Sequence, residues 1–290
     1  MSNTICGNNT ICSDALFVGN TPPQVSVDVA SLPGWSSLST GSYNITIVAK
    51  ADGYRDSEPS VAVSVQKAPA VVMPNKGDII TLDSKQYRVL KTEGTVAEVL
   101  AMYDANSSIN FDSASSGYDN TYAGKNIDTY CNNTFYSDLS AAMKSAIVDK
   151  TFTQDSWTTK NSAPTESHYT GKYGSSTYYL TLANAAYGSS ITRHCYCLSV
   201  QDVLDYLEAT TSMGTSDTTL TDTNIWTLFW NVTTSPGAKY IWLRSAYSLN
   251  SDRAYNVVGR FGYLGNVSVN YASAVRPAFQ IDLSKISWTK

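Results

Sequence analysis

The most restrictive feature of the sequence is a pair of short apolar runs joined by a turn. Residues 78–82 and 86–90 are rich in Ile, Leu, Val and Tyr, and the turn sequence Asp83-Ser84-Lys85 separates them. This pattern is typical of a β-hairpin. A further run at residues 95–102 predicts a third strand. We therefore expect an antiparallel sheet over this part of the chain.

Two helices are expected downstream of these strands. Apolar side chains that recur every four residues predict a helix beginning near Phe135. A second helix is expected to begin at Ser199, because its hydroxyl can cap the helix and Asp202 lies at the capping-box position. The apolar faces are Phe135, Leu139, Met143 and Ile147 in the first helix and Val200, Val203, Leu204 and Leu207 in the second.

The order of elements in residues 77–290 predicts the fold class. Residues 153–190 are rich in Ser, Thr and Tyr, and we interpret them as loops. Short apolar strands are expected at 240–243 and 278–281. A hairpin followed by helices and then by late strands indicates an α+β fold and not a βαβ arrangement.

The N-terminal part of the chain has a separate strand pattern. Residues 44–49 and 60–65 predict two strands connected through a turn at 53–57. Tyr43 is placed as in a tyrosine corner, in which the hydroxyl ties a loop of a β-sandwich. Residues 67–77 contain two prolines and predict a short, stiff linker.

Six positions in this first module have a familiar spacing. They are Leu38, Gly41, Tyr43, Ala49, Gly53 and Ser60. Together they resemble the second half of a fibronectin type III domain over roughly residues 22–67. The resemblance implies an all-β Ig-like spacer module at residues 1–67, short of the full strand set, followed by a second module at residues 77–290.

The composition excludes several classes of function. Net charge is −4 and the pI is near 5.1, so we expect no nucleic-acid partner. The sequence has no apolar run of ~18 residues, so we expect no membrane insertion. The first residues lack the basic and apolar regions of a signal peptide. Only 15% of residues are charged and 20 are tyrosines, a composition typical of contact surfaces.

The five cysteines suggest thiol chemistry only weakly. Cys6 and Cys12 could pair across a short loop. Cys195 and Cys197 follow a basic residue and a histidine, and a basic environment can activate a thiol. We nevertheless interpret the cysteines as structural thiols, because buried free cysteine behaves as a small apolar side chain.

The sequence contains few residues that could form a metal site or a hydrolytic site. The chain has two histidines, His168 and His194, too few for a histidine-rich metal site or for the expectation of a serine triad. We interpret His168 as a solvated loop residue. Asp104, Asp112 and Asp119 could form a calcium loop, but their spacing follows no EF-hand pattern, so a polar loop is favoured. No catalytic residue, metal or cofactor is therefore expected, although carboxylate pairing in space cannot be judged from sequence.

Five segments of the second module occur in a recognisable order. They are residues 77–90, Tyr130–Tyr136, Cys197-Leu198-Ser199, Trp242-Leu243-Arg244-Ser245 and Val275-Arg276-Pro277-Ala278-Phe279. This order resembles C-type-lectin-like domains of the formylglycine-generating-enzyme type. More narrowly, it is similar to the variable proteins of diversity-generating retroelements in phages and bacteria. The resemblance implies that Trp242, Arg244 and Arg276 are buried scaffold residues, the arginines bonded to loop carbonyls or a carboxylate.

In that family a C-terminal cassette is hypervariable and forms the binding surface. Residues 247–271 of this chain look like such a cassette, with Val257, Val267 and Val269 as inward anchors. We expect the polar and aromatic residues to share one exposed face, because side chains alternate along a strand. These are Tyr247, Asn250, Asp252, Arg253, Tyr255, Arg260, Phe261, Tyr263, Asn266, Ser268, Asn270 and Tyr271.

The resemblance implies a non-enzymatic binding protein. Its partner would be a protein or glycan on a cell surface, and the chain would be displayed on a virion, on a bacterial surface or in secreted form. Two alternatives stay open: an adhesin or glycan-binding module of fixed specificity, and a copper or thiol oxidase like the formylglycine-generating relatives. The sequence leaves the oligomeric state open.

Overall fold

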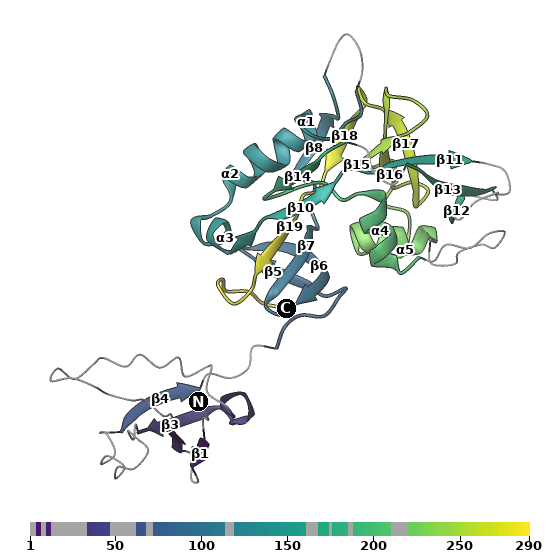
Figure 1. Ribbon diagram of the computed structural model, residues 1–290. Coiled ribbons are helices and arrows are strands. Elements are labelled where there is room, and N and C mark those ends of the chain that lie inside the picture. Colours follow the sequence, from purple (N-terminus) through teal and green to yellow (C-terminus); the bar gives the residue numbers. More distant parts are fainter. Residues whose placement is uncertain are drawn as a thin grey trace. The chain divides into compact units, whose positions relative to one another are not determined.

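The computed structural model describes residues 4–6, 10–12, 34–46, 62–67, 72–113, 119–160, 168–173, 176–184, 188–209 and 220–290. The chain divides into two compact units, Met1–Val72 and Met73–Lys290 (Figure 1). The boundary between them falls inside the linker expected at residues 67–77.

The first unit contains two antiparallel pairs of strands. β1 (Thr4–Cys6) pairs with β2 (Thr10–Cys12), and β3 (Gly41–Ile45) pairs with β4 (Val63–Lys67). A 3-10 turn, η2 (Trp35–Ser37), precedes β3. The strands expected at 44–49 and 60–65 are thus present as a pair. The first begins three residues earlier than expected, and the second begins three residues later. The turn expected at 53–57 lies outside the described residues.

The first unit also bears on the expectations for Tyr43 and for the pair Cys6 and Cys12. The Tyr43 side chain is buried and its hydroxyl donates a hydrogen bond to the Ser39 carbonyl at 2.6 Å. The contact expected of a tyrosine corner therefore forms. In the first pair of strands the register places Cys6 opposite Thr10 and not opposite Cys12.

One sheet of the second unit is built on the hairpin that the sequence predicts. Its turn residues, Asp83 and Ser84, both have positive φ, as a two-residue hairpin turn of type I′ requires. The strand expected at 95–102 is also confirmed, and the strand expected at 278–281 joins the same sheet. In order across the sheet, the strands are β5 (Ile79–Leu82), β6 (Lys85–Glu93), β7 (Val96–Ala101), β19 (Ala278–Asp282) and β9 (Ile147–Val148).

The single helix expected from Phe135 is wrong in its bounds and continuity. Helical structure begins earlier and is interrupted at Leu139, which is extended with ψ 149°. The next residue, Ser140, caps a new helix by accepting a hydrogen bond from the Met143 N–H at 3.1 Å. The segments are α1 (Asn126–Thr129), the π-helical η3 (Tyr130–Phe135), α2 (Tyr136–Asp138) and α3 (Ala141–Ala146).

The second predicted helix is confirmed with its cap. α4 (Val200–Leu207) begins after Ser199, and the side chains of Ser199 and Asp202 form both hydrogen bonds of a capping box. A further helix, α5 (Asp222–Trp230), is capped by Thr221 and was not predicted.

The interpretation of residues 153–190 as loops is wrong, because much of this stretch forms strands. Thr and Tyr fit a pleated surface well, and this preference outweighs the polarity of the stretch. Most of these strands enter an eight-stranded sheet with the late strands (Figure 1). They are β10 (Lys150–Thr153), β11 (Ser156–Lys160), β12 (His168–Tyr173) and β13 (Ser176–Asn184), followed by β14 (Ser190–Arg193), which pairs with β10.

The main path of the larger sheet runs β12-β13-β11-β15-β16-β17, with β18 beside β15 and β8 beside β18. The outer strands β12 and β17 also lie beside each other, so the sheet curls back on itself. The strand expected at 240–243 extends further, as β15. The bounds are β15 (Tyr240–Tyr247), β16 (Arg253–Val258), β17 (Tyr263–Ser268), β18 (Ala272–Val275) and β8 (Asn106–Asn110).

The hydrophobic core of the second unit extends from Ile80 to Leu283 along the chain. Trp242 is buried in it, as predicted. Its indole N–H donates to the Ile109 carbonyl at 2.8 Å, and its ring packs edge-on against Phe111. In the described part of the chain, the helices are all too short or too polar to cross a membrane.

Candidate functional site

The loop between β15 and β16 is held by a side chain from a distant part of the chain. The Asn120 side chain is buried, and its amide nitrogen lies 2.9 Å from the Tyr247 carbonyl oxygen. The same nitrogen lies 3.1 Å from the carbonyl oxygen of Asn250 and 2.7 Å from that of Arg253. One amide group therefore fixes the two ends and the middle of the loop.

Backbone hydrogen bonds from other strands complete the support of this loop. The Ser248 N–H donates to the Trp157 carbonyl at 2.7 Å, and the Val269 N–H donates to the Asp252 carbonyl at 2.8 Å. The side chains at the tip are exposed, and Leu249 retains 68% of its surface. The loop conformation thus depends largely on contacts made from outside the loop.

The adjoining hairpin adds polar side chains next to the loop. Arg253 lies opposite Ser268 and Tyr255 lies opposite Asn266 in the antiparallel register. Alternation along the strands therefore places Arg253, Asn266 and Ser268 on one side of the hairpin, together with Tyr255. The first three are half-buried and Tyr255 is buried. The Arg253 guanidinium donates to the Asn266 amide oxygen at 3.3 Å. We call the following residues the display surface: Leu249, Asn250, Ser251, Arg253, Asn266 and Ser268.

Other residues of the expected cassette lie elsewhere. Arg260 and Phe261 belong to the turn at the opposite end of the hairpin, where the guanidinium lies 5.1 Å from the Phe261 ring. Tyr263 is on the other side of β17 from Asn266, because the two positions differ by an odd number of residues. Tyr271 is exposed and packs edge-on against Tyr240. The twelve predicted residues therefore do not share one face.

Tyr255 is a clear correction, because its side chain is fully buried. It lies further into β16 than Arg253, and its ring packs edge-on against Tyr247, 5.9 Å away. Of the expected anchors, Val257 and Val269 are buried, whereas Val267 is only half-buried. The prediction that all three valines point inward is wrong, because the strand register places Val257 and Val267 on opposite sides of the hairpin.

Three more members of the predicted set flank the display surface. Asp252 is half-buried in the loop, and its backbone N–H donates to the Asn250 side-chain oxygen at 3.2 Å. Asn270 is exposed in the turn after β17. Tyr247, at the end of β15, is half-buried.

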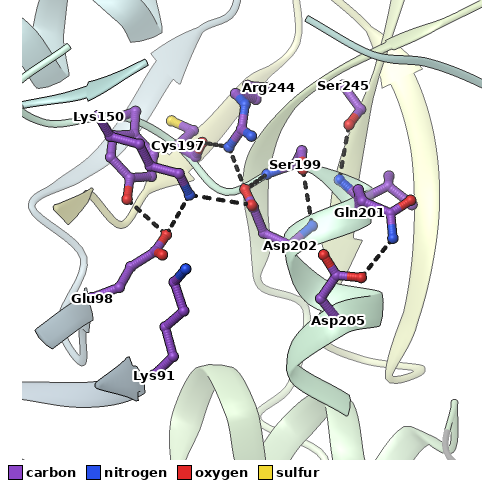
Figure 2. A network of polar contacts seen from close by, with 12 residues as sticks. Lys91, Glu98, Lys150, Cys197, Ser199, Gln201, Asp202, Asp205, Arg244 and Ser245 are labelled. Carbon is purple, nitrogen blue, oxygen red and sulfur yellow. Dashed lines mark hydrogen bonds and ion pairs between the residues drawn. The ribbon is translucent and has the colours of Figure 1, made fainter. Parts of the chain in front are cut away.

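A network of buried and half-buried charged side chains joins β15 to neighbouring elements (Figure 2). Arg244 is buried, and its guanidinium donates to the Asp202 carboxylate and, at 2.8 Å, to the Cys197 carbonyl. Lys150 continues the network, with its ammonium 2.6 Å from the Glu98 carboxylate and 3.5 Å from that of Asp202. Each of these charged groups therefore has an opposite charge beside it.

The charges in the network shift the ionisation of its members. Burial alone would raise the pKa of Asp202, but the charges of Arg244 and Lys150 outweigh burial and hold that pKa well below its usual value. Burial, with Glu98 beside it, raises the pKa of the Tyr196 hydroxyl well above the ordinary value. That hydroxyl donates to Glu98 at 2.7 Å. The network suits a permanent clamp between β7, α4 and β15.

Arg276 is the second predicted scaffold arginine, and it is buried with partners. Its guanidinium donates to the Asp104 carboxylate at 2.7 Å and to the Phe229 carbonyl, and it lies 5.5 Å from the Trp230 ring. Burial lowers the pKa of Arg276, and Asp104 opposes that shift. The expectation of a buried arginine bonded to a carbonyl and a carboxylate is confirmed at both Arg244 and Arg276.

The three cysteines of the second unit are shielded from solvent. Cys131, Cys195 and Cys197 are fully buried. Burial raises the pKa of Cys195, and burial together with Cys197 raises that of Cys131. The basic neighbours of Cys195 have other partners: Arg193 donates to Asp128 at 2.7 Å, and the His194 ring bonds to Asp149.

The remaining candidate ligands do not converge. The Lys125 ammonium lies 3.1 Å from the Asp112 carboxylate and 3.2 Å from that of Asp119, whereas Asp104 is bound to Arg276. Over the described ranges, no group of three or more His, Cys, Asp or Glu residues is placed to hold a metal. The side chain of His168 lies outside the described residues.

Fold and geometry together define an α+β protein with a polar loop held on a rigid scaffold. The chain belongs to the family described as a domain of unknown function, DUF6273, which matches residues 98–283. The matched range includes the Asn120 contacts, the ionic network and the display surface. No curated protein and no solved structure matches the chain.

Proposed function

We propose that this protein is a non-enzymatic binding protein that presents the display surface to a protein or glycan on a cell surface. The observation that carries the proposal is the support of the 248–252 loop by Asn120. Because the loop backbone is held from outside, its exposed side chains can change with little effect on folding. Exposed substitutions away from such supports usually alter stability by less than ~0.5 kcal/mol.

Pre-organisation of the loop also favours binding. A loop that is already ordered loses less conformational entropy when a partner binds. The display surface combines an exposed apolar side chain, Leu249, with the forked donor of Arg253 and with amide and hydroxyl groups. Arginine is enriched among residues that dominate binding energies. Such a mixture suits a polar partner that also offers a small apolar patch.

The scaffold that we propose is C-type-lectin-like, as in variable proteins of diversity-generating retroelements. Its support is the order of the motifs, the burial of Trp242, Arg244 and Arg276, and the position of the loop within the expected cassette. The first unit would then serve as an Ig-like or fibronectin-type spacer. An oxidase function has less support, because the three cysteines of the second unit are buried and the basic neighbours of Cys195 are bonded to carboxylates.

Binding can be tested with a fourfold alanine variant of the display surface. Probes are arrays of bacterial surface glycans and of purified surface proteins. We expect the parent chain to bind at least one array member, the variant to bind it at least tenfold more weakly, and the matched control to bind like the parent. The variant carries Asn250→Ala at an exposed position and Arg253→Ala, Asn266→Ala and Ser268→Ala at half-buried positions. The control carries Asn133→Ala, Thr233→Ala, Thr234→Ala and Lys239→Ala, which are all at exposed positions.

Melting temperatures of the three proteins separate binding from folding. We expect them to agree within a few degrees, because few of the altered side chains support the core. Retention of binding by the fourfold variant, or unfolding of that variant alone, would count against the display surface.

The DNA beside the gene distinguishes a variable surface from a fixed one. A retroelement origin predicts a nearby template copy of the 247–271 coding segment that differs mainly at adenines. If the flanking DNA has no such copy while the array binding is confirmed, the protein is an adhesin or glycan-binding module of fixed specificity.

A further inference from the structure

Two buried cysteine sulfurs are in contact close to the ionic network. The Sγ atoms of Cys131 and Cys197 are 3.7 Å apart, although the residues are 66 positions apart in sequence. Both side chains are fully buried, and both are free thiols in this structure. Cys195 is equally buried but makes no such sulfur contact within the described part of the chain. The structure therefore singles out one pair among these three thiols.

The backbone around the pair is fixed by other contacts. The Cys197 N–H donates to the Tyr122 hydroxyl at 3.1 Å, and the Cys197 carbonyl accepts from Arg244. Cys131 lies in the π-helical segment η3, whose surplus residue widens the helix at this point. The close approach of the two sulfurs is thus part of how η3 packs against the segment that enters α4.

We propose that Cys131 and Cys197 become joined by a disulfide bond when the chain folds in the presence of a disulfide oxidant, and that Cys195 remains a thiol. The thiolate of one cysteine attacks the oxidant, for example oxidised glutathione, and releases one glutathione thiolate. The second cysteine then attacks the mixed disulfide and releases the other. The two cysteines lose two protons and two electrons, and the oxidant becomes two thiols.

Burial decides when this bond can form and break. The thiolate is the reactive species, and burial makes it unfavourable in the folded protein. The oxidant therefore reacts while the chain is still folding. Once enclosed, the bond is shielded from reducing agents, so it acts as a permanent cross-link and not as a switch.

The bond can be tested by refolding the full-length chain. The protein is unfolded in denaturant with reductant, refolded in mixed oxidised and reduced glutathione, blocked with an alkylating agent and mapped by peptide mass spectrometry. We expect a linked peptide pair containing Cys131 and Cys197, and an alkylated Cys195. Recovery of all three residues in alkylated form, or a link through Cys195, would overturn the proposal.

Variants connect the chemistry to the fold. Oxidative refolding should raise the melting temperature of the wild-type chain and of Cys195→Ala by ~5 °C or more, because the cross-link restricts a long loop in the unfolded chain. Cys131→Ala and Cys197→Ala should show no such rise. Reductant added to the oxidised wild-type protein should leave the link intact until denaturant unfolds it. Rapid reduction in the absence of denaturant would show that the bond is exposed and contradict the buried placement.

Discussion

Buried polar side chains hold the backbone of this protein where regular structure ends. Asn120 binds three loop carbonyls, Arg244 binds the Cys197 carbonyl, and Arg276 binds the Phe229 carbonyl. The two arginines could be predicted, because each stands in a recognisable short motif. Asn120 could not: it lies in a polar stretch without periodicity, and its nearest loop partner along the chain is 127 residues away.

The Asp202 carboxylate should make stability depend on pH. Its folded pKa is held below the unfolded value of ~3.9, so ionised Asp202 contributes fully above about pH 4 and loses its contribution as pH falls through the folded pKa. Asp202→Asn removes the carboxylate that bonds to the buried Arg244 guanidinium and should cost about 3 kcal/mol at pH 7. The difference from wild type in urea unfolding should shrink below about pH 4.

Asp205→Asn is the matched control, one turn further along α4. Asp205 is exposed, and its carboxylate accepts a hydrogen bond from the Gln201 side chain, so the change should cost less than ~0.5 kcal/mol. Equal costs for the two substitutions, or a difference that does not vary with pH, would show that the Arg244–Asp202 pair is not the source of the effect.

Individual elements show which local signals are reliable. The hairpin at Asp83-Ser84 and the cap at Ser199 were predicted because a few adjacent residues determine each one. The break at Leu139 was missed, because the apolar repeat continues through it while the Ser140 cap begins a new helix. In 168–184 the strands were missed because the stretch is polar, although β12 and β13 are neighbours along the chain and pair with each other. The display surface could be predicted only as a segment, since register decides which side each residue occupies.

Two glycines with the same φ offer a direct test of the packing of α5. Gly262 and Gly94 both have φ +59°, but a Cβ at Gly262 would lie 2.3 Å from the Asp222 Cα, whereas a Cβ at Gly94 meets no atom within 4 Å. Gly94→Ala should cost about 1 kcal/mol for the left-handed conformation alone. Gly262→Ala should cost about 3 kcal/mol or more, because overpacking is added. Chemical denaturation of both variants measures the difference; equal costs would mean that the β16–β17 turn does not pack on the start of α5.

At the scale of the whole molecule, the α+β class and the position of the linker follow from the order of apolar runs. The curl of the larger sheet does not. It depends on strands that are far apart in sequence and polar on much of their surface, such as β12 and β17. The buried cluster extends from Ile80 to Leu283 and therefore lies entirely within the second unit.

A fragment of residues 73–290 should therefore fold by itself. We expect it to unfold in one cooperative transition, with a midpoint within about 2 °C of the corresponding transition of the full chain, because the whole buried cluster is retained. Differential scanning calorimetry of both proteins tests this. A lower midpoint for the fragment would show that the first unit contributes to the stability of the second.

The edges of the two sheets determine whether neighbouring copies of the protein can add strands to each other. An open edge strand offers unpaired N–H and carbonyl groups to any neighbouring chain and invites aggregation. In the larger sheet β12 and β17, the ends of the main path, approach each other, and the branch through β18 ends at β8. In the smaller sheet, Thr289 bridges to Thr81 on β5, and the opposite end is the two-residue β9. Neither end of the smaller sheet therefore offers a long open edge to a neighbouring copy of the second unit, which limits the addition of strands there.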